Sequence, residues 1–508
     1  MKKAVSLILM VCIVLAGCQK SPEKSSVASK AEGLSKDVIA KALKEGEKKS
    51  LDIPEHWSMS EKKSNDRVTI SADLDLGKVE VGNLPVIEMK NHELSQKELE
   101  KMVSYFAKDE AIYKPQAYTK QVYQKLIDRI DKKEGIYGDT SMWTSYQELE
   151  SALKSAMDLA PEAYPEPESA EIKFQKKITD PAFLAAQDWA GGKKEENTEG
   201  ENYFTADVGK ERNSYINAER YDSNIENSSS FVWQEGADII EAADIADFKN
   251  QCKYKLDSGM DTTGFVQKYS DLLDHYEACL DQNEDVDEAE GKKQAEQVLK
   301  DLEVSNVEFS SSEQVLWFPK EAFPERDSLG YWTDHLWQGD LSRAEAGYQY
   351  TFLNFVEGIP AEQVYGTVSQ NTTESYTPPF PVEKITITVT KDGVKSFKWK
   401  GMTEEADRVA DNTQLMSFEN IQNLLTEQIF YWYSQGGQPA NDPTLFDYKV
   451  ESAQLVYTYV PAYGEPKNAW LVPAWVFSVD EYVNRIEASG DISFVLNALD
   501  GGVIGRTD

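Results

Sequence analysis

Four histidines have the side chains best suited to acid–base or metal chemistry near neutral pH: His56, His92, His275 and His335. No two of them form the His-Glu-x-x-His pattern that places two zinc ligands on one helical face. None stands beside a cysteine at the short spacing typical of structural zinc sites. Because each histidine is isolated in the sequence, we expect surface or capping roles for all four, and no metal centre.

Motifs for nucleophilic catalysis and phosphate binding are also missing from the sequence. It contains no Gly-x-Ser-x-Gly elbow, no phosphate-binding glycine loop and no Gly-x-Gly-x-x-Gly fingerprint. Paired carboxylates of the kind that glycosidases use cannot be singled out among 88 acidic residues without geometry. We therefore predict no catalytic residue, no cofactor and no enzyme activity.

An acidic run from residue 281 to 291 matches the start of a calcium-binding EF-hand loop. Asp281, Asn283 and Asp285 occupy the first three ligand positions. Val286, however, stands where that loop requires glycine, and Lys292 stands where it requires glutamate. This excludes an EF-hand loop, and we interpret the run as a solvated acidic linker.

One loop combines aromatic side chains in a way that suits binding. The segment from residue 330 to 340 contains Tyr331, Trp332, His335 and Trp337 together with two acidic residues. Aromatic rings displayed in a loop stack on sugar rings or on an apolar patch of a partner. If the loop instead closes over the core, the same rings become core residues. Both interpretations stay open, and these four residues are the candidate binding loop.

The body of the chain contains two cysteines, Cys252 and Cys279. A disulfide between them is chemically allowed outside the membrane. Sequence spacing does not show whether their Cα atoms come close enough to bridge. The sequence therefore leaves a structural Cys252–Cys279 disulfide open.

Another cysteine, Cys18, follows a charged and then apolar N-terminal segment. Lys2 and Lys3 precede an apolar run over residues 4–16, which is shorter than the roughly 20 residues that cross a bilayer. This is the layout of a secretory signal peptide. The sequence Leu15-Ala16-Gly17-Cys18 resembles the lipobox of bacterial lipoproteins.

The lipobox resemblance implies that residues 1–17 are removed and that the Cys18 thiol carries a diacylglycerol. Two acyl chains anchor a protein stably, whereas one holds it only marginally. We therefore expect a membrane-bound protein that faces outside the cell. The net charge of −35 disfavours nucleic acid, which is bound by neutralising phosphates with lysine and arginine. We interpret the acidity as a solvated surface, and attraction of cations is the alternative.

Hydrophobic patterning predicts an α+β fold with antiparallel sheets and helices packed on one face, in two or three domains. Asp392-Gly393 between two alternating runs predicts a hairpin, and Ser95 with Glu98 forms a capping box. A helix is predicted after Ser417, with its apolar stripe formed by Phe418, Ile421, Leu425, Ile429 and Trp432. The predicted parts are a tether (18–65), an N-terminal α+β domain (66–235), an acidic helical segment (236–303) and a C-terminal α+β domain (304–508).

Three C-terminal stretches carry a resemblance to known families. They are "KITITVTKDGVKSFKWKG" leading to "LMSFENI", "LVPAWVFSVD" at 471–480 and "VLNALDGGVIGR" at 495–506. Together with the lipobox they resemble a family of surface lipoproteins, domain-of-unknown-function family 6034, over most of the chain. The C-terminal order of hairpin, helix and strands is similar to PepSY-type domains and to YycH/YycI-type regulators of cell-wall histidine kinases. These resemblances imply a fold and no catalytic residues.

Three functions are compatible with these features. The leading hypothesis is a lipid-anchored, non-enzymatic binding or regulatory ectodomain that contacts a protein partner in the cell envelope. The first alternative is a solute-binding lipoprotein of a transporter, and the second is a hydrolase of cell-wall polymer.

Overall fold

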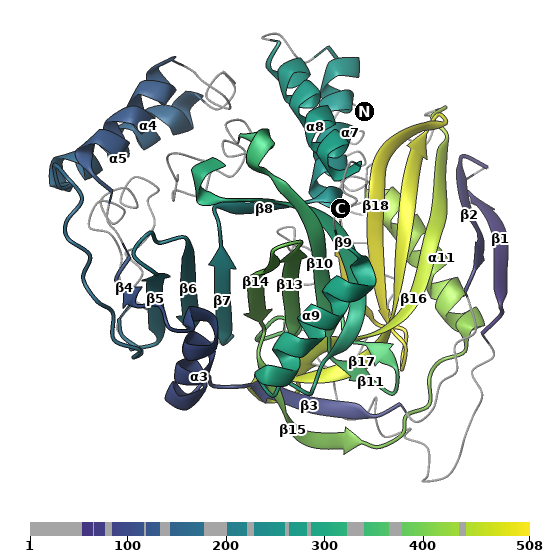
Figure 1. Cartoon of the computed structure of the whole chain (residues 1–508). Helices are drawn as coiled ribbons and strands as arrows, with labels where there is room; N and C mark the ends of the chain where they lie inside the picture. The colour runs from purple at the N-terminus through teal and green to yellow at the C-terminus, as the bar shows by residue number, and fades with distance from the viewer. Residues whose placement is uncertain are drawn as a thin grey trace, which may run out of the picture.

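The protein has a mixed α/β fold in which strands predominate (Figure 1). This computed structural model describes residues 53–64, 66–76, 84–115, 118–132, 143–176, 201–220, 228–259, 264–281, 286–322, 340–364, 378–435 and 443–507. Two large sheets, here called sheet A and sheet B, form most of it, and β11 (Phe355–Val356) pairs with β12 (Ile359–Pro360) separately. This mixed fold with mainly antiparallel pairing is compatible with the expected α+β class.

Sheet A takes its eight strands from both ends of the chain. Its main path is β1-β2-β16-β17-β18-β19, and β3 and β15 join it at β17. β2 pairs with β16 in parallel, and the other pairs among these strands are antiparallel. The strands are β1 (His56–Lys63), β2 (Val68–Asp75), β3 (Val86–Asn91), β15 (Thr403–Ala410), β16 (Phe446–Ala462), β17 (Glu465–Val483), β18 (Ile486–Asn497) and β19 (Val503–Thr507).

The long strand β17 divides one of its edges between two neighbours. β3 pairs with residues 468–471, and β18 pairs with residues 474–483. β16 pairs along the other edge of β17. Figure 1 shows β3 and β15 running across the bottom of the molecule, crosswise to the strands of sheet B above them. Sheet A therefore extends one arm, made of β3 and β15, toward sheet B.

Sheet B contains nine strands, and every neighbouring pair is antiparallel. Its order is β4-β5-β6-β7-β14-β13-β10-β9-β8. The strands are β4 (Ile112–Tyr113), β5 (Tyr203–Val208), β6 (Ser214–Glu219), β7 (Ser230–Glu235), β8 (Asp238–Glu241), β9 (Glu308–Phe318), β10 (Glu345–Leu353), β13 (Lys384–Thr390) and β14 (Gly393–Lys400).

Helices cover one face of sheet B, as predicted. One face of β10 carries Ala346, Tyr350 and Phe352, because alternate residues of a strand point to the same side. Ala346 belongs to the apolar cluster that contains side chains of α7 and α8. Tyr350 and Phe352 belong to the cluster that contains side chains of α3 and α9. A separate helix, α11, packs on sheet A, and α4 packs against α5. The helices are α3 (Gln96–Ala107), α4 (Lys120–Lys132), α5 (Trp143–Leu159), α7 (Ala242–Asp257), α8 (Phe265–Asp281), α9 (Glu288–Asp301), α11 (Phe418–Gln435), and the 3₁₀ turns η5 (Lys320–Ala322) and η6 (Leu341–Arg343).

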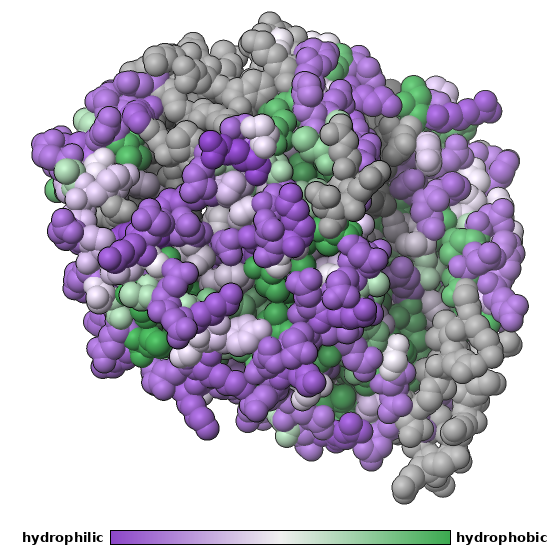
Figure 2. Space-filling view, in the orientation of Figure 1, coloured by the Kyte–Doolittle hydropathy of each residue, from purple (hydrophilic) through white to green (hydrophobic). Residues whose placement is uncertain are grey.

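Local patterns predicted several elements correctly. The Ser95–Glu98 capping box begins α3, and β13 and β14 form the hairpin expected at Asp392-Gly393. The first four residues of the expected α11 stripe, from Phe418 to Ile429, are buried, whereas Trp432 is half-buried and Tyr433 fills the core instead. Polar and charged residues cover most of the face in Figure 2, in keeping with the net charge of −35.

Two predictions about the organisation of the chain need correction. The tether was expected to extend to residue 65, but β1 is an ordered strand whose Trp57 is buried in the core of sheet A. The expected domain boundaries at residues 235 and 303 do not separate the sheets, because β2 pairs with β16 and β7 pairs with β14. The hairpin β13–β14 also lies in sheet B, whereas α11 and the strands after it belong to sheet A.

Candidate functional site

The chain crosses between the two sheets in several places, and these crossings lie together. β14 of sheet B continues into β15 of sheet A through Gly401 and Met402. Gly401 has a φ of +68°, and a Cβ atom there would lie 2.7 Å from the carbonyl oxygen of Val382. Only glycine fits such a position without strain. The tight turn at Gly401 therefore lets the chain change sheets within two residues.

A second crossing runs beside the first. It leads from β3 of sheet A to α3, which packs on sheet B. The main-chain N–H of His92 donates to the carbonyl oxygen of Met402 at 3.0 Å, which ties the two crossings together. A third crossing leaves β10 of sheet B at Asn354 and enters β11, whose Val356 is buried in the core of sheet A.

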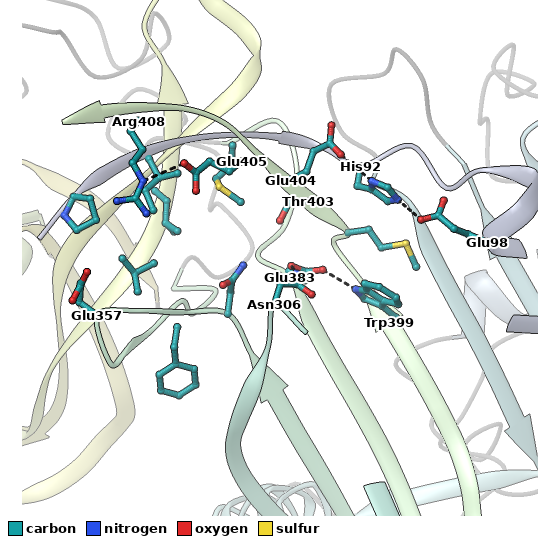
Figure 3. Close-up of a pocket in the computed structure, with 18 residues that line it drawn as sticks. His92, Glu98, Asn306, Glu357, Glu383, Trp399, Thr403, Glu404, Glu405 and Arg408 are labelled. Carbon is teal, nitrogen blue, oxygen red and sulfur yellow. Dashed lines mark hydrogen bonds and ion pairs between the residues drawn. The ribbon is translucent and has the colours of Figure 1, made fainter. Parts of the chain in front are cut away.

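A pocket of about 530 Å³ lies where these crossings meet, and we call it the junction pocket (Figure 3). Its volume falls within the range of small-molecule sites, about 300–1,000 Å³. Its walls combine apolar side chains with carboxylates. The lining residues are Pro85, Ile87, Met89, His92, Glu98, Asn306, Asn354, Phe355, Val356, Glu357, Glu383, Trp399, Met402, Thr403, Glu404, Glu405, Arg408 and Leu471.

Glu383 is the buried acid of the junction pocket. It lies in the inner wall with no solvent-exposed surface, directly before β13. Trp399 Nε1 donates to its Oε1 at 2.9 Å, and Asn306 Nδ2 donates to its Oε2 at 2.7 Å. Burial raises the pKa of Glu383 to about 7, and the hydrogen bonds from Trp399, Asn306 and the main chain of Thr403, together with the charge of His92, only partly offset it. Within the described ranges of the chain, Glu383 forms no ion pair.

His92 joins three elements at the rim of the pocket. Its Nε2 lies 2.9 Å from Oε1 of Glu98 in α3, and its Nδ1 lies 3.1 Å from Oε2 of Glu404 in β15. Burial lowers the pKa of His92, but the hydrogen bond to Glu404 and the charge of Glu98 outweigh it and raise that pKa overall. Hydrogen bonds from Lys90 and His92 lower the pKa of Glu404. The positive charge of His92 is therefore stabilised between two carboxylates when the ring is protonated.

Arg408 and Glu405 form the remaining ion pair of the pocket lining, with Nε of Arg408 3.2 Å from Oε1 of Glu405. Glu357, which also lines the pocket, is exposed in the turn between β11 and β12. It forms no ion pair with any residue that the structure describes. The lining thus holds five carboxylates, two of which (Glu357 and Glu383) lack a cationic partner among the described residues.

The lining has features of a ligand site, and Glu383 itself is not placed for acid catalysis. A general acid must reach the atom that it protonates, within hydrogen-bond distance or through one water. Glu383 has a pKa in a useful range, but it has no exposed surface from which to reach a substrate. The apolar walls with a few polar groups match the usual lining of a ligand site.

The structure separates the residues that the sequence singled out. Cys252 in α7 and Cys279 in α8 are not bridged to one another, so the disulfide left open by the sequence is not formed in this structure. The two cysteines belong instead to the apolar core between these helices and sheet B. Cys18 and the candidate binding loop, Tyr331, Trp332, His335 and Trp337, lie outside the described residues.

The two other histidines that the structure describes, His56 and His275, lie outside the pocket lining. His56 contacts Asp73 and Asp75 across the β1–β2 pair, and His275 is exposed on α8. His92, expected to have a surface or capping role, lines the pocket. No cluster of three metal-ligating side chains occurs in the part of the chain that the structure describes.

Sequence reasoning missed Glu383, Asn306 and Trp399. Their contacts join residues 16 to 77 positions apart, and a glutamate directly before a strand gives the same signal as an ordinary surface charge. The signal that could have pointed to Glu383 is its place between Val382 and the apolar strand that begins at Ile385.

Comparisons with known proteins show no family membership. No protein-family description matches the chain, and no curated protein matches it. A crystal structure of an uncharacterized protein from Eubacterium rectale ATCC 33656 is similar at a TM-score of 0.38 and 10% identity, covering 89% of this chain and 93% of that one.

Among the described helices, none has the length and apolar character needed to cross a membrane.

Proposed function

We propose that this chain is a lipid-anchored protein of the bacterial cell envelope that binds a small ligand in the junction pocket and does not catalyse a reaction. The anchor is inferred from Leu15-Ala16-Gly17-Cys18 and the signal-like segment before it. The single observation that carries the binding role is the pocket itself, with a buried, unpaired carboxyl group in its inner wall.

The position of the pocket also suits a regulatory role. Its walls come from both sheets and from the segments that connect them. A ligand that contacts β3 and β15 on one side and the β10–β11 connection on the other favours one relative placement of the sheets. Ligands shift such equilibria by their difference in affinity for the two placements. An envelope protein that contacts this chain could then sense whether the pocket is filled.

We propose both family resemblances for this chain, the second for a smaller part of it than the sequence suggested. We propose membership of domain-of-unknown-function family 6034 on the sequence stretches quoted above. A PepSY-like unit is proposed for α11 with β16 to β19 alone, since the preceding hairpin belongs to the other sheet.

Two alternatives have less support from the site. A transporter's solute-binding protein would use the same pocket, and transport assays in cells lacking this protein would separate the two roles. A wall hydrolase requires an accessible acid with a raised pKa; Glu383 is enclosed, and the more accessible Glu98 and Glu404 have lowered pKa values.

A thermal-shift screen of the full-length protein in detergent tests the binding role. The panel contains sugars, short peptides, organic ammonium ions and carboxylates. A ligand that binds only the folded state raises the melting temperature, and the rise increases with the ratio of ligand concentration to Kd. We expect at least one class to raise it, whereas no shift with any member of the panel would contradict the proposed function.

A further inference from the structure

The side chain of Asn306 connects the buried acid with the pocket interior. Its Nδ2 donates to Oε2 of Glu383 at 2.7 Å, the direction that an ionised carboxylate requires. The other end, the carbonyl oxygen Oδ1, has no hydrogen-bond partner among the described residues, and Asn306 is exposed in the pocket lining. The pocket therefore offers a free acceptor that is hydrogen-bonded to the buried acid behind it.

The side chains that line the pocket include more carboxylates than cationic groups. Its cations, His92 and Arg408, are already paired with Glu98, Glu404 and Glu405. The two remaining carboxylates, Glu357 and Glu383, form no ion pair within the described parts of the chain, although the charge of His92 acts on Glu383. A buried carboxylate is costly unless a counter-charge or hydrogen bonds compensate it. The hydrogen bonds and the charge of His92 offset the burial of Glu383 only in part, so a cation that enters the pocket would stabilise its ionised form further.

We propose that the junction pocket binds an organic ammonium ion, with Asn306 Oδ1 accepting a hydrogen bond from its N–H and Glu383 balancing its charge from the inner wall. This inference rests on the proposed binding function and names the ligand class. Ile87, Met89, Phe355 and Leu471 supply apolar walls for the hydrocarbon part of such an ion. The net charge of −35 on the chain attracts cations toward the protein from solution.

Ammonium binding is coupled to release of a proton. Glu383 is protonated in the empty pocket at slightly acid pH, because burial raises its pKa to about 7. An ammonium ion stabilises the ionised form, so the carboxyl O–H bond breaks, the proton passes to water, and the carboxylate stays behind with the cation. The titratable groups that act on Glu383 are His92, whose positive charge favours the carboxylate, and Tyr459, whose pKa the Glu383 charge raises further.

Three probes of matched shape test the ligand class on the full-length protein in detergent: phenethylammonium, phenethyl alcohol and phenylacetate. Isothermal titration calorimetry measures each affinity at about pH 5.5 and about pH 8, where the ionised fraction of a group with a pKa near 7 differs by about 30-fold. We expect phenethylammonium to bind most tightly, to bind up to about 30-fold more tightly at the higher pH, and to release a proton near neutral pH.

Variants show which groups are responsible. Glu383→Gln removes the pH dependence and weakens binding of phenethylammonium, and Asn306→Leu weakens it at both pH values. Glu465→Gln, at an exposed turn away from the pocket, leaves binding unchanged. If Glu383→Gln does not fold, two measurements still test the inference. They are the pH dependence of phenethylammonium binding to the wild type and the affinity of Asn306→Leu for this ion.

Several results would overturn the inference. Equal affinity for the alcohol and the ammonium ion excludes a role for charge, and equal affinity of the ammonium ion at both pH values excludes Glu383 as its partner. Tight binding of phenylacetate, or of an uncharged member of the screening panel, without binding of the ammonium ion would leave the proposed function standing and remove this ligand class. Failure of all probes and of the whole panel would remove both.

Discussion

Trp57 and Gln422 lie 365 residues apart in the chain, and Nε1 of Trp57 donates a 2.8 Å hydrogen bond to Oε1 of Gln422. The Trp57 ring also meets Phe418 of α11 edge-on, with ring centroids 5.2 Å apart. The strand nearest the proposed membrane anchor is therefore built into the core of sheet A. A force or displacement that arrives along the N-terminal segment acts directly on α11.

Replacing Trp57 by alanine should destabilise the protein strongly. The side chain is 3% exposed, and Trp→Ala changes in cores cost about 3–5 kcal/mol because they remove buried surface and leave a cavity. Urea unfolding of Trp57→Ala, compared with Ser58→Ala at the neighbouring exposed position, measures this cost. Equal stabilities of the two variants would mean that β1 is not part of the core.

Glu383 should make the protein less stable as the pH rises. Its pKa is raised from the ordinary value of 4.5 to about 7 in the folded state, so the folded state binds the proton more tightly than the unfolded state. The free energy of unfolding then falls between about pH 4.5 and 7, by about 3 kcal/mol in total for this group. Urea unfolding across this range should show a smaller decrease for Glu383→Gln than for the wild type, and parallel curves would contradict this assignment.

His92 should titrate above its ordinary value in NMR spectra. The hydrogen bond to Glu404 and the charge of Glu98 raise its pKa despite burial. Its ion pairs therefore contribute stability below about pH 6.5 and lose it as the pH rises through the folded-state pKa. Replacing Glu404 by glutamine should lower the pKa of His92, whereas Glu465→Gln should leave it unchanged. An unshifted His92 resonance in Glu404→Gln would show that the rim ion pair does not form.

Cys18→Ala should release the protein from membranes. Without the thiol no diacylglycerol can be attached, and the short apolar segment before it cannot anchor a mature protein. Cys12→Ala, within the same segment, serves as the matched control and should stay membrane-bound. Fractionation combined with mass spectrometry of the N-terminal peptide checks both. An unmodified N-terminus at Cys18 in the wild type would contradict the proposed anchor.

Local patterns predicted the elements of this fold better than their arrangement. The α11 stripe and the hairpin at Asp392-Gly393 follow from residues close in sequence, where periodicity and turn chemistry decide the structure. The parallel pairing of β2 with β16 depends on residues more than 370 positions apart, and no local pattern encodes it. The expected domain boundaries rested on the same local patterns, so they could not take account of strand pairing between distant parts of the chain.

The junction pocket was missed for a related reason. Glu383, Asn306 and Trp399 have unremarkable sequence neighbours, and they become a site only when the start of β13, the end of β14 and the α9–β9 connection meet. The aromatic loop at residues 330–340 attracted attention because its residues are adjacent in the sequence. Sites assembled from one short segment are therefore easier to predict than sites assembled where chain crossings meet.

The central claim is that the junction pocket holds a ligand, and blocking the pocket tests it most directly. Glu405→Trp places a large ring in the pocket lining, whereas Asp407→Trp places the same ring on an exposed residue of the same strand outside the lining. We predict that a ligand of the screening panel raises the melting temperature of the wild type and of Asp407→Trp but not that of Glu405→Trp. An equal rise in all three proteins, or no rise in the wild type, would contradict the claim.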